Sequence, residues 1–193
     1  MRSRPPVRLS WKDEEEIARR ILSGEIGAVP TETVAGLVAR STATDRLNAL
    51  KDSPAAKPLT LFASGFEQAR ELWGRPAGPA VEQLAALWPG PLTLVAGGPP
   101  PVGVRVPDYP PLLRLPARTG PLASTSANLS GAPAPARVED LAQDLLARLD
   151  FIVSDPELRP SGLASTVLAC GPEGVKLLRA GGIAEVAWRR VLA

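Results

Sequence analysis

Short apolar runs alternate with amphipathic segments along this chain, but not in a strict strand–helix–strand order. The runs typical of buried strands lie at 26–30, 59–63, 92–96, 103–106, 151–153, 166–169 and 175–178. Some neighbouring runs are joined by connections too short for a crossover helix, such as the glycine- and proline-rich turn at 97–101. The pattern therefore predicts an α/β fold with a mixed sheet covered by helices, rather than a purely parallel sheet.

Glycine and proline separate the expected helices. The first helix follows a capping box at Ser10 and Asp13 and ends at Gly24. The others are expected at 44–51, 66–73, 80–88, 137–149 and from 184 onward. The segment 137–149 has the clearest helical stripe, which consists of Val138, Leu141, Leu145 and Leu149. No repeat or flexible linker is evident, so we expect a single domain, 1–193.

Two residue types that carry much of enzyme chemistry are nearly missing. The chain has no histidine, which excludes Ser-His-Asp and Cys-His catalysis and most transition-metal sites. Its single cysteine, Cys170, excludes an internal disulfide and a cysteine-cluster zinc site. Of the 22 basic residues, 18 are arginine, which suits forked contacts with phosphate or carboxylate. Chemistry in this chain must therefore depend on positioning and charge.

Global properties narrow the functional classes further. A net charge of +2 is too small to indicate nucleic-acid binding by itself. Neither G-x-x-x-x-G-K nor G-x-G-x-x-G occurs, so these two routes to nucleotide binding are not indicated. No apolar run reaches the roughly 20 residues needed to cross a bilayer, and the N-terminus lacks a signal-peptide-like stretch. We expect a cytoplasmic protein without a membrane partner.

The segment 124–131, STSANLSG, is the densest polar stretch in the chain. Its hydrogen-bonding side chains are Ser124, Thr125, Ser126, Asn128 and Ser130. Each such group costs about 1 to 3 kcal/mol when it is buried without a partner, so a polar ligand could supply the missing partners. An ordinary turn whose side chains cap their own backbone is the alternative.

Three other polar segments lie at or near the ends of expected strands, where ligands of layered folds usually bind. They are PTET at 30–33, the loop between Lys51 and Lys57, and Ala164-Ser165-Thr166. Only four lysines occur in the chain, and two of them flank this one loop. A solvated loop without a function is the alternative interpretation for the lysine pair.

Taken together, the ordered segments resemble the YrdC/Sua5 family of threonylcarbamoyl-adenylate synthases over roughly 25–182. The matching motifs are PTETVAGL at 30–37, Lys51 with Pro58-Leu59, WPGPLT at 88–93, RVPD at 105–108, STSANLSG at 124–131, Ser165-Thr166-Val167 and LRAG at 178–181. The resemblance is to the short, single-domain form of the family, without the C-terminal domain of the longer Sua5 proteins.

This resemblance implies a three-layer α/β (α+β) fold of the YrdC/RibB-like type, with a twisted mixed sheet around a positively lined cavity. It also implies a nucleotidyltransferase that makes threonylcarbamoyl-AMP and pyrophosphate from L-threonine, bicarbonate and ATP. Mg²⁺ would bind through the ATP phosphates, with no dedicated protein ligands. Other proteins would then transfer the threonylcarbamoyl group to an adenosine beside the tRNA anticodon. Such chemistry needs aligned reactants and neutralised phosphate charge more than a nucleophile.

The same resemblance implies roles for individual residues. Thr31 and Thr33 would help to hold the amino acid, and Lys51 would contact a phosphate or the carbamate carboxylate. The nucleotide and acyl phosphate would be bound by Ser124, Thr125, Ser126 and Asn128. The cavity would be closed by Ser165, Thr166 and Arg179. Lys57 would add positive charge, whereas Arg105 would either bind substrate or pair with a structural carboxylate such as Asp108.

Three positions depart from the family pattern. Ser53 replaces the arginine of a K-x-R motif, and losing one charged hydrogen bond costs about 1.5 to 3 kcal/mol, roughly 10- to 150-fold in affinity. Ala35 replaces an aromatic residue, and the acidic segment 154–157 replaces a glycine-rich stretch. Two alternatives therefore stay open: a paralogue that binds tRNA, double-stranded RNA or a small metabolite, and a related carbamoyl-handling enzyme.

Overall fold

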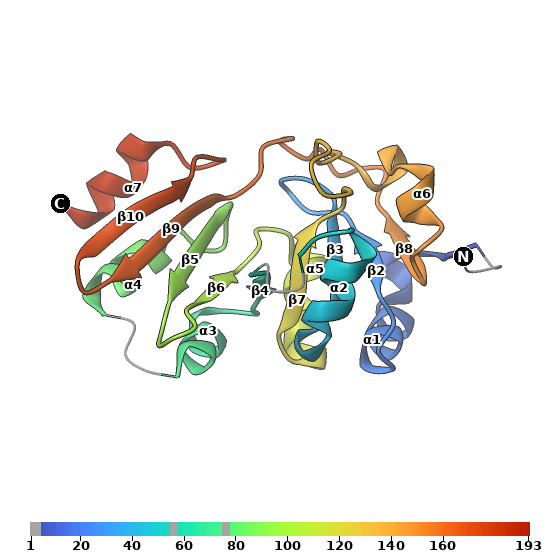
Figure 1. Cartoon of the computed structure of the whole chain (residues 1–193), viewed down its shortest axis with the longest axis horizontal. Helices are drawn as coiled ribbons and strands as arrows, with labels where there is room; N and C mark the ends of the chain where they lie inside the picture. Colours follow the sequence, from blue (N-terminus) through green and yellow to red (C-terminus); the bar gives the residue numbers. More distant parts are fainter. Residues whose placement is uncertain (1–4, 55–57, 75–77) are drawn as a thin grey trace.

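The computed structural model describes residues 5–54, 58–74 and 78–193. In this part of the chain the strands form one mixed sheet in the order β1-β8-β2-β3-β7-β4-β6-β5-β9-β10 (Figure 1). The strands are β1 (Val7–Ser10), β2 (Gly27–Val29), β3 (Gly36–Arg40), β4 (Thr60–Phe62), β5 (Leu92–Ala96), β6 (Val102–Arg105), β7 (Leu122–Ser126), β8 (Phe151–Ser154), β9 (Thr166–Gly171) and β10 (Gly174–Arg179). Strand β2 pairs antiparallel with β3 and parallel with β8, which confirms the predicted mixed sheet.

Helices and short 3-10 turns occupy the connections. The helices are α1 (Glu14–Leu22), α2 (Thr44–Leu50), α3 (Phe66–Trp73), α4 (Pro79–Leu84), α5 (Pro110–Thr119), α6 (Gln143–Leu146) and α7 (Glu185–Leu192). The 3-10 turns are η1 (Trp11–Asp13), η2 (Ser41–Ala43), η3 (Ala85–Leu87) and η4 (Val138–Asp140). None of the described helices is long and apolar enough to span a membrane.

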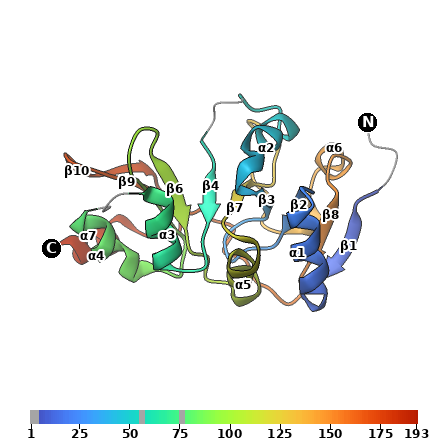
Figure 2. The ribbon, with the colours of Figure 1, turned by 90° about the horizontal axis from the view of Figure 1, so that it is seen from below.

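Helices cover both faces of the half of the sheet that contains β8, β2, β3 and β7. Ala28 and Leu37 belong to one apolar cluster, together with residues of α2 and α6. Their neighbours Val29 and Val38 belong to a second cluster, together with residues of α1 and α5. Since successive strand residues face opposite sides of a sheet, the two clusters lie on its two faces. Figure 2 shows the resulting three layers.

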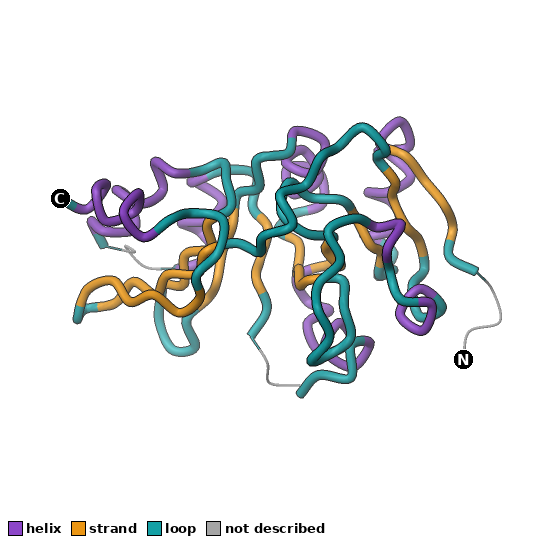
Figure 3. Tube along the Cα trace, turned by 90° about the horizontal axis from the view of Figure 1, so that it is seen from above, coloured by secondary structure: helices purple, strands orange, loops and turns teal. Residues whose placement is uncertain are grey.

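The other half of the sheet has its own apolar cluster, formed with α3, α4 and α7. The Trp73 indole donates to the carbonyl of Val102 at 3.0 Å and stacks on Trp88, with 6.1 Å between ring centroids. The connection 155–165 leads from β8 in the first half to β9 in the second. Figure 3 shows loops rather than helices gathered above the centre of the sheet.

The predicted helix at 137–149 is wrong. Only η4 and the four-residue helix α6 form in this segment, because Leu141 and Ala142 are extended, with ψ of 134° and 138°. The four residues of the expected stripe are nevertheless all buried. The apolar periodicity therefore identified what the core buries, but not the path that the backbone takes.

Candidate active site

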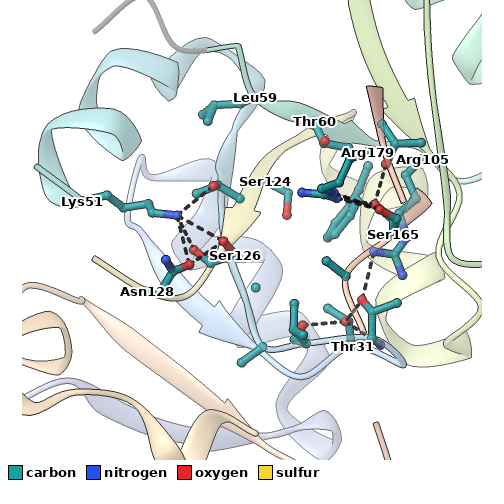
Figure 4. Close-up of a pocket in the computed structure, with 18 of the residues that line it drawn as sticks. Thr31, Lys51, Leu59, Thr60, Arg105, Ser124, Ser126, Asn128, Ser165 and Arg179 are labelled. Atoms are coloured by element: carbon teal, nitrogen blue, oxygen red, sulfur yellow. Dashed lines mark hydrogen bonds between the residues drawn. The ribbon is translucent and has the colours of Figure 1, made fainter. Parts of the chain in front are cut away.

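A cavity of about 200 Å³ lies where the two halves of the sheet meet (Figure 4). Ten residues that the sequence singled out line it: Thr31, Thr33, Lys51, Arg105, Ser124, Thr125, Ser126, Asn128, Ser165 and Arg179. Thr166 does not line it, and Lys57 lies outside the described residues. Segments almost 150 residues apart in sequence thus meet in one cavity, whose lining is hydroxyl-rich and cationic.

Lys51 is buried at one end of the cavity, directly after α2. Its ammonium Nζ donates to the hydroxyl of Thr125 at 3.0 Å and to the carbonyl of Ser126 at 2.6 Å. Nζ also donates to the Ser126 hydroxyl at 3.3 Å and to Asn128 Oδ1 at 3.5 Å. The Asn128 amide nitrogen in turn donates to the carbonyl of Ala132 at 2.7 Å. The segment STSANLSG begins within strand β7 and continues past its end. It therefore forms a cavity wall around the buried ammonium group of Lys51.

The PTET loop forms a tight hydroxyl network below the cavity. The Thr31 hydroxyl donates to the carbonyl of Val34 at 2.7 Å, accepts from the amide of Thr33 at 3.1 Å, and lies 2.8 Å from the Thr33 hydroxyl. A hydroxyl has one proton and two acceptor lone pairs, so these contacts saturate Thr31. Thr33 also accepts from Arg105 Nη1 at 3.0 Å. The two threonines therefore hold Arg105 in the cavity wall.

Arg105 pairs with a carboxylate, but not with Asp108. Its Nη2 donates to Glu32 Oε1 at 2.5 Å, and both side chains are largely buried. Asp108 contributes only its backbone amide, which donates to the same Glu32 oxygen at 3.0 Å. The guanidinium also lies 5.8 Å from the centroid of the Phe62 ring. Arg105 is thus both a cavity residue and a member of a structural ion pair, with Glu32 as the partner that the sequence did not reveal.

Arg179 lies on the last strand of the sheet and reaches across to Ser165. Its Nε and Nη2 donate to the carbonyl of Ser165 at 3.1 and 2.8 Å, and Nη2 also donates to the hydroxyl of Ser165 at 3.0 Å. Desolvation, together with the nearby positive charge of Arg105, lowers the pKa of the Arg179 guanidinium. Among the described residues no carboxylate counters this shift, since burial and Arg105 are its only causes. A negatively charged ligand oxygen would relieve this repulsion.

Positive charge is divided between two sides of the cavity. Figure 4 shows Lys51 on one side and both arginines on the other, with the Ser124 hydroxyl between them. A ligand with two separated anionic groups matches this arrangement. Within the described residues no three His, Cys, Asp or Glu side chains gather where they could hold a metal ion. The described lining therefore offers cations and hydroxyl groups, which are the groups that an anionic ligand requires.

Thr166 stabilises the fold and does not line the cavity. Its side chain is fully buried, donates to the carbonyl of Ile183 at 2.8 Å and accepts from the amide of Ile183 at 2.9 Å. These bonds fix the segment that leads into α7. Two threonines to which the sequence analysis gave no role in the site, Thr60 and Thr93, line the cavity instead. Thr93 ends the WPGPLT motif, which was the available signal.

The three departures from the family pattern have different structural outcomes. Ser53 does not line the cavity, and its buried hydroxyl has no hydrogen-bond partner among the described residues. Ala35 does line the cavity and is fully buried. Asp155 does not: it accepts from the hydroxyl of Tyr109 and from the amides of Glu157 and Leu158. Of these three departures from the family pattern, only Ala35 alters the lining of the cavity.

Fold and cavity define the class: a mixed α/β sheet protein with a cavity lined by hydroxyl groups and by the cationic side chains of Lys51, Arg105 and Arg179. The family model that matches residues 19–181 covers Sua5, YciO and YrdC proteins and is described as telomere recombination. The chain belongs to this family. Threonylcarbamoyl-AMP synthases of Bacillus subtilis and Pyrococcus abyssi are both 36% identical to it, over 92% and 84% of the chain. The chain spans 56% and 52% of their lengths, about half.

Solved structures agree with this assignment. Pyrococcus abyssi Sua5 complexed with L-threonine matches with a TM-score of 0.85 and 33% identity, over 97% of this chain and 60% of that one. Escherichia coli YciO matches with a TM-score of 0.77, over 97% of this chain and 99% of that one. The second match, at 18% identity, shows the fold alone. The expected fold class is confirmed.

Proposed function

We propose that this protein is a threonylcarbamoyl-AMP synthase that uses L-threonine, bicarbonate and ATP. The observation that carries the proposal is the two-sided distribution of positive charge, with Lys51 facing Arg105 and Arg179 across one cavity. Threonine and ATP each bring anionic groups, so two cationic regions match two ligands held together. The names of the relatives and the threonine complex of one of them support the same conclusion.

The proposed reaction has two steps. The amino group of threonine bonds to the carbon of bicarbonate, and water leaves to give a carbamate. A carbamate oxygen then attacks the α-phosphorus of ATP, and the bond to pyrophosphate breaks. Mg²⁺ brought by ATP would neutralise part of the phosphate charge. Other proteins would transfer the product to an adenosine of tRNA.

The residues contribute by placement and charge. Lys51 is held by the oxygens of Thr125 and Ser126 at the wall where a phosphate or carbamate would bind. Ser124 presents a hydroxyl between the two cationic regions. Arg179 faces the cavity beside Arg105 and would bind the second anionic group. Such preorganised donors stabilise charge that develops at phosphorus without having to reorganise during the reaction.

Pyrophosphate release tests the proposal. We expect the protein to release pyrophosphate only when ATP, bicarbonate and L-threonine are all present. Lys51→Ala should lower the rate by about 100-fold or more, since a charged contact at the reacting groups is lost. Circular dichroism of the variant controls for folding, because Lys51 is buried. Release from the unaltered protein that does not exceed release from Lys51→Ala would refute the proposal.

A further inference from the structure

Thr93 is a buried polar residue to which neither the family motifs nor the proposed reaction gives a task. It lies on β5, in the interior of the sheet, and only 1% of its surface is exposed. Its hydroxyl is 2.9 Å from the hydroxyl of Ser165, which precedes β9. Both residues line the cavity. Strand β5 pairs parallel with β9, with Thr93 opposite Val167, so a rigid strand supports the end of the 155–165 connection.

The hydroxyl groups of Thr93 and Ser165 have one proton more than their hydrogen bonds use. Ser165 accepts from Arg179 Nη2 at 3.0 Å and shares one hydrogen bond with Thr93. Two hydroxyls carry two protons, and one proton suffices for the bond between them. Among the described residues no acceptor takes the second proton, and Arg179 Nη1 has no partner there either. Both donors belong to cavity-lining residues, where a ligand acceptor can satisfy them.

We propose that Thr93 is a positioning residue, which fixes Ser165 and through it Arg179 so that together they bind one anionic oxygen of a substrate. This proposal rests on the proposed function for the identity of the substrates. The oxygen belongs to a phosphate of ATP or to the carboxylate of L-threonine, and both offer the same acceptor chemistry. Ser165 and Thr93 act as one unit, because either hydroxyl alone loses the bond that orients it.

Isothermal titration with ATP and with L-threonine, measured separately, identifies which ligand supplies the oxygen. Thr93→Val keeps the shape of the side chain and removes the hydroxyl. We expect it to weaken binding of one of the two ligands about five- to tenfold and to leave the other unchanged. Thr93→Ser should restore binding, since it restores the hydroxyl. Thr119→Val is the matched control, because Thr119 bonds the carbonyl of Leu115 in α5, outside the cavity.

A double-variant cycle tests whether Thr93 acts through Ser165. The variant with both Thr93→Val and Ser165→Ala should bind no more weakly than the worse of the two single variants. Losses that add in full would overturn the proposal, as would wild-type binding of both ligands by Thr93→Val or a failure of Thr93→Ser to restore binding. Because binding is measured without turnover, an inactive protein would refute the proposed function while these outcomes still decide the role of Thr93.

Discussion

At the scale of single residues, the positive charge of Arg105 in the cavity is balanced by the carboxylate of Glu32, which does not line the cavity. Glu32 holds Arg105 at 2.5 Å, with side-chain exposures of 17% and 6%. Its second oxygen, Oε2, is buried without a hydrogen-bond partner among the described residues. Removing the charge of Glu32 would leave a buried guanidinium without a counter-ion, which is more costly than breaking a pair at the surface.

Glu32→Gln is therefore expected to lower the free energy of unfolding by about 1.5 to 3 kcal/mol. Urea denaturation measures this change. The control is Glu67→Gln on α3, which removes the charge from an exposed pair with Arg70. We expect no measurable change there. Equal effects of the two substitutions would mean that the buried pair does not stabilise the site.

Asp155 gives the protein a predictable response to acid. The hydrogen bond from Tyr109, with those from the amides of Glu157 and Leu158, holds the pKa of the Asp155 carboxyl below its usual value of 3.8. The folded state thus prefers the charged form. Its stabilising contribution is present above the usual carboxyl pKa and is lost as the pH falls below that value, through the pKa of the folded state.

Urea midpoints measured from about pH 6 to about pH 2 test this expectation. The difference between the unaltered protein and Asp155→Asn should shrink at the acid end of the range. Tyr109→Phe removes the main cause of the shift, so its stability should depend less steeply on pH in the same range. A difference between the unaltered protein and Asp155→Asn that stays constant with pH would contradict the assignment.

At the scale of elements, the sequence predicted most of the regular strands and helices but missed those with unusual composition. Helix α5 contains three prolines, two in its first turn, where no amide donor is needed, and Pro116 in its interior. Strand β7 includes Ser124–Ser126, which resemble a turn because hydroxyl residues favour local backbone bonds. Strands β1 and β3 were also not predicted. For α5 and β7, tertiary contacts outweigh local preference.

One glycine links the last strand to the site. A Cβ on Gly181 would lie 2.2 Å from the carbonyl oxygen of Ala164 and 2.4 Å from the carbonyl carbon of Ser165. Gly181→Ala should therefore displace Ser165, destabilise the fold by about 1 to 3 kcal/mol and weaken substrate binding. Thermal unfolding and titration measure the two effects. Gly171→Ala is the control, because a Cβ there would meet nothing within 4 Å; similar results for both variants would contradict this packing argument.

At the scale of the whole molecule, the site could be predicted only from motifs. Apolar periodicity indicated strands and helices, whereas the resemblance to a family gathered segments between Thr31 and Arg179 into one cavity. Glu32 and Thr93 were missed, because their roles depend on contacts between distant loops and strands that spacing does not encode. Thr166 was included because it adjoins Ser165, although its hydroxyl serves the fold.

We propose above all that this cavity brings threonine and ATP together and joins them through the carbon of bicarbonate. Mass spectrometry of the products formed from L-threonine, ATP and bicarbonate with a heavy carbon isotope tests it most directly. We expect threonylcarbamoyl-AMP that carries the heavy carbon, formed in amounts equal to the pyrophosphate released. ATP cleavage without a labelled adenylate, or an adenylate of threonine that lacks the labelled carbon, would contradict the proposed function.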